Sequence, residues 1–506
     1  MAAGTLVSRA TGLARTAALA AAVGVGLLSD AYTAASVVPT MLLVLVTGGT
    51  LSSALVPVLS RAEDTGTQKQ AAGTALLLMA ALAASATVLL ALTSPAVARF
   101  LSLGARDQGD YAERVRVVTI LLVLVAPQVF LLAITAVTSS VLTVRGRLGI
   151  VGWAPVATNL AFLGALVLYV AVVPAASDPV PTGGLLILGL GSTLASMVGC
   201  AAQLFAASSA LPRWRDVIRH RDGGVVRELR RTGGWTLFYV LTNQAGLLAV
   251  LAVAARRNGV ASAYQWSFAV MQLPFALIGV TLLSATLPAL ARAVDDRADF
   301  NRLVRRAAVP LVALLLPCAV ALALFAPVLA ELLVGYGATD EDGTALVARG
   351  IAIFALALLP FAAYQVMTRS CYALKRPSWP ALSNVAVNAV TATGALLALR
   401  PATAAGVLTV LVASYALSYV VGAVVLGIAL SKAGVHVSGG LWRPALRSGA
   451  ATVAAMTIVL VLRALLPASW LLEVSALLAF GAVTALGALP SLTQALARAP
   501  HAPGSR

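Results

Sequence analysis

Charge is scarce in this sequence. Only 10% of the 506 residues are charged and 60% are hydrophobic, whereas a soluble globular chain carries about 25% charged residues. Cysteine and histidine are also rare, with three of each. The cysteines form no CxxC pair and the histidines show no ligand spacing, so we expect no disulfide framework, no metal site and no cofactor. The composition excludes a soluble domain and indicates a membrane protein.

Long apolar runs fill the rest of the chain. Runs of about 18 or more apolar residues predict transmembrane helices. We count fourteen, near 6–28, 31–59, 71–92, 117–142, 151–173, 183–207, 235–254, 262–291, 308–330, 350–372, 380–398, 404–430, 445–465 and 469–492. The connections are short, so the sequence predicts an all-α polytopic membrane protein with no separate soluble domain.

The basic residues gather in alternate connections. With fourteen spans, the arginine-rich segments 213–231 and 292–306 share a side with both termini, and Asp340-Glu341-Asp342 lies on the other. The positive-inside rule then places both termini in the cytoplasm. We attribute the net charge of +17 to this orientation and to contact with anionic lipids, not to nucleic acid. A cleaved N-terminal signal peptide is the alternative, but it would leave thirteen spans and spoil the charge pattern.

Two pairs of similar segments within the sequence indicate a duplication. ALVPVLSRA at 54–62 resembles ATLPALARA at 285–293, and Pro155-x-x-x-Asn159 resembles Pro380-x-x-x-Asn384. A six-span unit repeats in the same orientation, which gives two pseudo-symmetric lobes. We expect an N-terminal lobe over 1–210, a C-terminal lobe over 211–434, an extra helix pair over 435–492 and a cytoplasmic tail over 493–506. The paired asparagines suit interhelical hydrogen bonds.

Two arginines, Arg9 and Arg15, lie inside the first apolar span, and Asp30 follows it. A cation at the centre of a membrane helix costs about 2.5–3.5 kcal/mol on insertion scales, so such residues usually face a functional cavity. Arginine binds phosphate oxygens bidentately and keeps its charge when desolvated. We therefore expect an anionic ligand here. The alternatives are that Arg9 extends to the interface and that Asp30 caps the following helix.

These residues form part of a recognisable pattern. Ser8-Arg9-x-x-Gly12-x-x-Arg15, Asp30-Ala-Tyr32 and Ser52-x-Ala54-Leu-Val-Pro57 resemble the opening of the MurJ/MviN lipid II flippase family, within the multidrug/oligosaccharidyl-lipid/polysaccharide exporter superfamily. The resemblance implies two lobes around a cationic cavity, with the extra helix pair lining a groove for a polyprenyl tail. It places Ser8, Arg9 and Arg15 at head-group and pyrophosphate positions, and Asp30 at a functional acid.

Other positions extend or weaken this assignment. Asn243 and Gln272 lie within the seventh and eighth spans and are further substrate-binding candidates. Several charges of the family pattern are missing, at Thr16, at Leu43 or Val44, and at Gly48, Ala269 and Gln272. Arg256, Arg257 and Gln265 are candidates to replace them. Otherwise the chain is a divergent relative with another substrate or none.

The resemblance predicts a non-enzymatic flippase of the bacterial cytoplasmic membrane. Its cargo would be lipid II, a polyprenyl-diphosphate-linked saccharide, moved by alternating access. The alternatives are an exporter of another polyprenyl-linked oligosaccharide, a small-molecule antiporter of the same fold, and a transport-inactive scaffold that binds cell-wall synthesis proteins. A membrane glycosyl- or phosphotransferase would need an acidic or histidine cluster at an interface, and the sequence shows no convincing one.

Overall fold

The computed structural model describes residues 2–46, 55–56, 58–60, 62, 67–173, 180–211, 234–436, 442–466 and 469–496. Within these ranges the regular structure is helical, without a strand. Twelve helical segments there are long and apolar enough to cross a membrane, and α20 adds a shorter apolar stretch at Leu471–Gly487. The predicted fold class, an all-α polytopic membrane protein, is confirmed.

Each of the fourteen predicted spans coincides with helix over the residues that the structure describes; residues 47–54 and 57 of the second span lie outside them. The first six correspond to α1 (Ala2–Val23), α2 (Leu27–Val46), α4 (Gln68–Leu101), α5 with α6 (Tyr111–Val125, Pro127–Val144), α7 (Leu148–Val172) and α8 (Thr182–Ala207). The others correspond to α11 (Gly234–Ala254), α12 with α13 (Val260–Pro274, Val280–Arg292), α14 with α15 (Arg297–Leu324, Ala326–Val334), α16 (Glu341–Ala373), α17 (Ser378–Leu397), α18 (Ala404–Lys432), α19 (Trp442–Leu465) and α20 (Trp470–Leu496).

Three predicted spans are interrupted, which hydropathy alone does not reveal. The fourth divides where Pro127 begins α6, because proline lacks the N–H that would continue the α5 ladder. The eighth contains a π-helical turn, Phe275–Gly279, directly after Pro274. The ninth breaks at Phe325 between α14 and α15.

The chain divides into two compact units. The first contains 1–263, 332–344 and 399–407, and the second contains 264–331, 345–398 and 408–506. These units describe packing, so the lobe boundaries inferred from the repeats stay a prediction. The α12 helix begins in the first unit and continues in the second from Tyr264.

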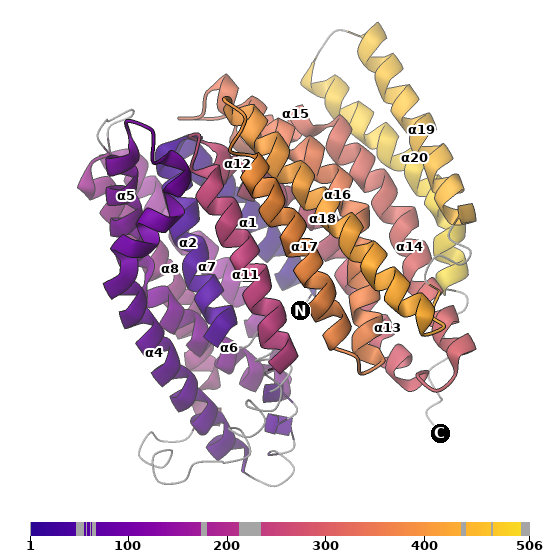
Figure 1. Cartoon of the computed structure of the whole chain (residues 1–506), viewed down its shortest axis with the longest axis horizontal. Helices are drawn as coiled ribbons and strands as arrows, with labels where there is room; N and C mark the ends of the chain where they lie inside the picture. Colours follow the sequence, from indigo (N-terminus) through magenta and orange to yellow (C-terminus); the bar gives the residue numbers. More distant parts are fainter. Residues whose placement is uncertain are drawn as a thin grey trace. The chain divides into compact units, whose positions relative to one another are not determined.

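Small residues allow close helix packing in the first unit. A Cβ atom at Gly104 would lie 2.7 Å from the Ala252 carbonyl oxygen, and one at Gly189 would lie 2.6 Å from the Leu124 side chain. Such contacts bring helix backbones together where lipid gives no hydrophobic drive for association. Here α7 packs on α8 and on α1, and α4 packs on α6 (Figure 1).

In the second unit, α19 and α20 lie side by side and both pack on α14 (Figure 1). Their core is an apolar cluster of Phe325, Ala455, Val459, Ala476 and Phe480. Arg463 closes the end of this pair with a bidentate ion pair to Glu473, at 2.6 and 3.0 Å. The Arg463 guanidinium also lies over the Phe325 ring, 5.1 Å from its centroid.

Candidate functional site: a half-buried arginine and a buried acid

Arg15 lies on α1, half-buried between aromatic side chains of α2 and α7. Its guanidinium is 4.6 Å from the centroid of the Phe162 ring, and its Nη2 donates to the Tyr32 hydroxyl at 3.4 Å. Tyr32 stacks on Phe162 with ring centroids 5.7 Å apart. Cation–π contact stabilises a guanidinium without neutralising it. No carboxylate in the described ranges pairs with Arg15, so its charge remains available to an anion.

The other predicted residues of α1 are placed differently. Arg9 is exposed and Ser8 is half-buried. The Ser8 carbonyl accepts a hydrogen bond from Asn159 Nδ2 at 3.3 Å, and the same amide donates to Thr11 Oγ1 at 3.1 Å. Asn159 therefore fixes α7 to α1, which confirms the interhelical role expected for it. Arg9 does not share the aromatic setting in which Arg15 is held.

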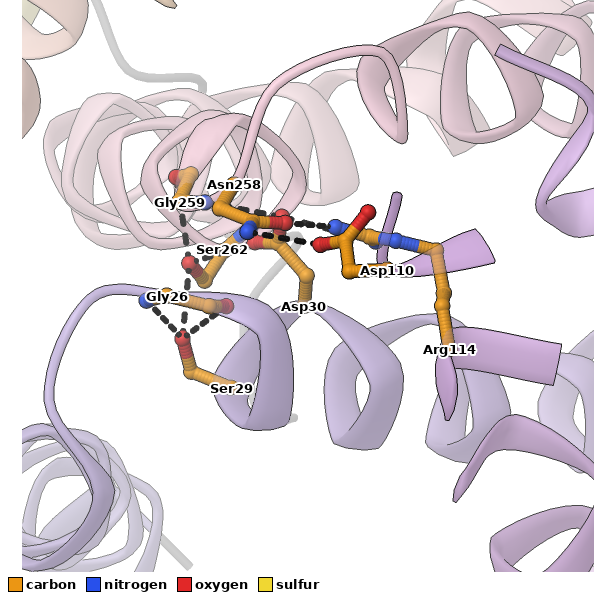
Figure 2. Close-up of polar contacts among 8 residues, drawn as sticks. All are labelled: Gly26, Ser29, Asp30, Asp110, Arg114, Asn258, Gly259 and Ser262. Atoms are coloured by element: carbon orange, nitrogen blue, oxygen red, sulfur yellow. Dashed lines mark hydrogen bonds and ion pairs between the residues drawn. The ribbon is translucent and has the colours of Figure 1, made fainter. Parts of the chain in front are cut away.

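Asp30 is fully buried in the first turn of α2. One carboxylate oxygen accepts from the Gly259 N–H at 2.9 Å, and the other accepts from the N–H and the hydroxyl of Ser262, each at 2.8 Å (Figure 2). The first N–H groups of a helix have no partner within it, and they favour a negative charge. Asp30 thus caps α12, which is distant in sequence. It does not cap its own helix, which was the alternative interpretation of this acid.

Arg114 neutralises this buried acid. Its guanidinium lies 3.8 Å from Asp30, and both side chains are at most 3% exposed. Arg114 also donates to the Asn258 side-chain oxygen, and the Asn258 amide donates to Asp110 at 2.9 Å (Figure 2). We call Asp30, Asp110, Arg114, Asn258, Gly259 and Ser262 the Asp30 cluster. It connects α2, the start of α5 and the α11–α12 turn within the first unit.

Sequence patterns alone do not select the partners in these two sites. Arg114 lies three residues before the predicted fourth span, where a loop charge is unremarkable, and its burial appears only in the folded chain. Tyr32 and Phe162 are 130 residues apart in the sequence. The signal that could have pointed to α12 is Gly259, directly before the helix begins at Val260: glycine has no side chain to accept from the first N–H groups, so another residue must do so.

The remaining candidates are scattered. Asn243 is half-buried on α11 in the first unit, and Gln272 is half-buried on α12 in the second. Arg257 donates to the Ala402 carbonyl at 2.6 Å, while Arg256 is half-buried. Gly48, the arginine-rich segment 213–231 and the end of the tail, 497–506, lie outside the described residues.

Comparison with known proteins identifies the family. The family model described as "Lipid II flippase MurJ" matches residues 19–481. This chain belongs to the MurJ family. It is 28% identical over 300 residues to the probable lipid II flippase MurJ of Haemophilus influenzae, covering 57% of this chain and 56% of that protein. With the lipid II flippase MurJ of Burkholderia cenocepacia it is 28% identical over 395 residues, covering 76% and 75%.

Solved structures agree on the fold of this MurJ-family chain. It superposes on "Lipid II flippase MurJ, inward closed conformation" with a TM-score of 0.74 at 16% identity, covering 98% of this chain and 99% of that one. An inward-facing multidrug resistance MATE family transporter of the MOP superfamily gives a TM-score of 0.68 at 14% identity, covering 84% and 95%. The chain is thus a multi-pass membrane protein with the fold shared by these transporters.

Proposed function

We propose that this chain is a flippase that moves lipid II, a polyprenyl-diphosphate-linked saccharide, across the bacterial cytoplasmic membrane by alternating access. The match to the family over residues 19–481 carries this proposal. The relatives from Haemophilus and Burkholderia are named as lipid II flippases. The chain acts as a transporter and not as an enzyme, with both termini in the cytoplasm as its charge distribution predicts.

Arg15 supplies the chemistry that this cargo requires. A diphosphate presents several oxygens, and a guanidinium offers five N–H donors in a planar fork. Among the described residues, the Tyr32 hydroxyl is the one hydrogen-bond acceptor of Arg15, and that contact is long, at 3.4 Å. We propose that the other donors bind the diphosphate. Arg9, about 9 Å further along the helix axis, binds the head group together with Ser8, and Asn243 and Gln272 are secondary contacts.

The Asp30 cluster supports the conformational part of this mechanism. Alternating access needs an element that has two discrete arrangements. The bonds from Asp30 to Gly259 and Ser262 hold the start of α12, and the same helix continues into the second unit. We propose that these bonds stabilise one state of the transport cycle and break in the other, so that Asp30 acts on transport through α12.

The test is complementation of cells depleted of their lipid II flippase. We expect the intact chain to restore growth and to expose lipid II to a membrane-impermeant probe at the outer face. Arg15→Ala removes charge-assisted hydrogen bonds and should lower the flipping rate about ten- to a hundred-fold. The flipping rate of Arg15→Lys should lie between those of the intact chain and Arg15→Ala. Arg99→Ala, at an exposed arginine in the last turn of α4, is the matched control.

A second candidate function is a transport-inactive scaffold for cell-wall synthesis proteins. It is favoured by the uncharged residues Leu43, Ala269 and Gln272 at positions that are charged in the family pattern. The same experiment separates the two functions. Growth restored equally by the intact chain and by Arg15→Ala, with no change in exposed lipid II, would support the scaffold and contradict the flippase.

A further inference from the structure

A groove of about 440 Å³ lies in the second unit, beside the turn that joins α16 to α17. The last turns of α18 form its other wall. Its lining combines two cations with apolar side chains and includes no acid: Arg376, Trp379, Val425, Ile428, Ala429 and Lys432. Val425 is 39% and Ile428 is 52% exposed, so the apolar wall of the groove lies on the exposed face of α18, a membrane-spanning helix.

The two cationic side chains of this groove have no hydrogen-bond acceptor among the described residues. Arg376 lies flat over the Trp379 ring, with its guanidinium carbon 4.7 Å from the ring centroid. Stacking uses the face of a guanidinium and leaves its N–H edges free to bind oxygen. No acceptor for Arg376 or Lys432 occurs in the part of the chain that the structure describes, and both side chains are exposed.

The related turn in the first unit shows the contrast. Both turns close a helix with the same hydrogen bond, from Arg147 N to the Leu142 carbonyl at 2.9 Å and from Arg376 N to the Cys371 carbonyl at 3.0 Å. In the first unit, however, Arg147 donates its side chain to the Ala206 carbonyl. Arg145 donates to the side chains of Gln68 and Ser209. The arginine side chains of that turn donate hydrogen bonds within the protein, whereas the Arg376 side chain has no such acceptor among the described residues.

The backbone of the α16–α17 turn is also unusual. Lys375 has φ of 57°, and it is the one residue other than glycine with positive φ among those described; the related turn has Gly146 with φ of 70°. This left-handed position ends helices and strongly favours glycine. A lysine there strains the backbone, and it adds a third positive charge beside the groove. Strained residues of this kind point to a functional constraint.

We propose that this groove binds the phosphate of an anionic phospholipid of the inner leaflet. Arg376 and Lys432 bind the phosphate oxygens, Lys375 adds to the local positive potential, and one acyl chain lies along Val425 and Ile428. Tryptophan and basic side chains are the residues that anchor helix ends at lipid head groups. The charge pattern that places the termini in the cytoplasm places this groove at the inner leaflet. The proposal does not depend on which cargo the chain transports.

The test compares lipid binding to the purified full-length chain by native mass spectrometry. We expect dioleoyl phosphatidylglycerol to bind more tightly than dioleoyl phosphatidylcholine. Removing two interfacial charges in Arg376→Gln/Lys432→Gln should weaken the phosphatidylglycerol affinity about 30-fold. The matched control, Arg145→Gln/Arg147→Gln, removes two charges from the related turn and should retain the affinity to within about three-fold.

Lys375→Gly separates charge from folding. Glycine relieves the strained φ, so the thermal midpoint should rise, whereas the phosphatidylglycerol affinity should fall about five-fold through loss of one charge. If Arg376→Gln/Lys432→Gln fails to fold, a photoactivatable phosphatidylglycerol on the unmodified chain should label the peptides that contain Trp379 or Ile428.

Four results would overturn the proposal. The first is an unchanged phosphatidylglycerol affinity in a folded Arg376→Gln/Lys432→Gln variant, and the second is equal binding of phosphatidylcholine. The third is photolabelling elsewhere on the chain. The fourth is effective competition by either of two compounds, free glycerol 1-phosphate or a polyprenyl diphosphate. Competition by the first of these would mean a site for soluble phosphate, and by the second a site for cargo.

Discussion

The Asp30–Arg114 pair places two opposite charges in the protein interior, each at most 3% exposed. Removing such charges from water costs several kcal/mol per ion, and their attraction repays this only when further hydrogen bonds satisfy them. Here the Gly259 and Ser262 donors and the Asn258 oxygen provide those bonds. The pair therefore depends on its neighbours, and removing one member leaves the other buried without compensation.

Asp30→Ala should lower the free energy of unfolding by about 3–5 kcal/mol, because Arg114 remains buried without its counter-charge. The reduced stability is measured as the thermal midpoint of the purified protein in detergent. Adding Arg114→Met should recover a large part of the loss, since the uncompensated charge is then gone. If the stability losses of Asp30→Ala and Arg114→Met simply add, the two residues are not energetically coupled, which would contradict the ion pair.

The ring under Arg15 leads to a second residue-scale prediction. Phe162→Leu keeps an apolar side chain but removes the cation–π contact, which is worth about 0.5–2 kcal/mol. We expect the lipid II flipping rate to fall by about two- to thirty-fold. The thermal midpoint should fall as well, because the Phe162 ring is fully buried and a smaller side chain leaves a cavity. Phe268→Leu is the control, because that ring packs on Phe354 and Tyr415 and no cation of the described ranges lies over it. Equal flipping by both variants would remove Phe162 from the site.

At the scale of helices, the sequence was informative because a membrane leaves few choices. Backbone groups in lipid must be bonded internally, so a long apolar run becomes a helix, and all fourteen predicted spans coincide with helix over their described residues. The breaks at Pro127 and after Pro274 were not predicted, since proline is tolerated within membrane helices and its effect depends on neighbours. Arg15 could be selected as a cation inside an apolar span, but the α12 partners of Asp30 lie 229 and 232 residues away.

Helix ends show how such long-range contacts arise. The last carbonyls of a helix lack intrahelical partners, and those of α1 are met by the turn that follows α15. Ala338 N donates to the Ala21 carbonyl at 2.9 Å, and the Thr339 hydroxyl donates to the Ala20 carbonyl at 3.1 Å. Gly337, with φ of 69°, lies directly against Ala21. This turn is therefore the C-terminal cap of the helix that carries Arg15.

Gly337→Ala should destabilise the protein by about 2–5 kcal/mol, the sum of a left-handed alanine and a collision of its Cβ with the Ala21 carbonyl. Gly146→Ala is a matched control, because Gly146 has nearly the same φ but a Cβ atom added there would meet nothing within 4 Å. It should cost about 1–2 kcal/mol. Thermal midpoints of the two variants give the comparison. Equal losses would show that the cap contributes nothing beyond backbone strain.

At the scale of the whole molecule, the transport proposal depends on orientation. Basic residues in cytoplasmic connections set the orientation of a polytopic protein, whereas acidic residues contribute little. Under that rule Glu341, at the start of α16, lies outside the cell, and Asp295, between α13 and α14, lies inside. Both side chains are exposed, so a cysteine at either position can react with a maleimide. Cys200 and Cys371 are buried and Cys318 is half-buried, which makes a cysteine-free background attainable by small substitutions.

In that background, Glu341→Cys should react with a membrane-impermeant maleimide in intact cells. Asp295→Cys should react only after the membrane is permeabilised. The contrast follows from charge placement alone, because each position is separated from the other by α14 and α15, the predicted ninth span. Labelling of Asp295→Cys in intact cells would show that the protein has the opposite orientation in the membrane. The phospholipid groove beside Lys432 would then face the outer leaflet, and the direction proposed for lipid II transport would lose its structural basis.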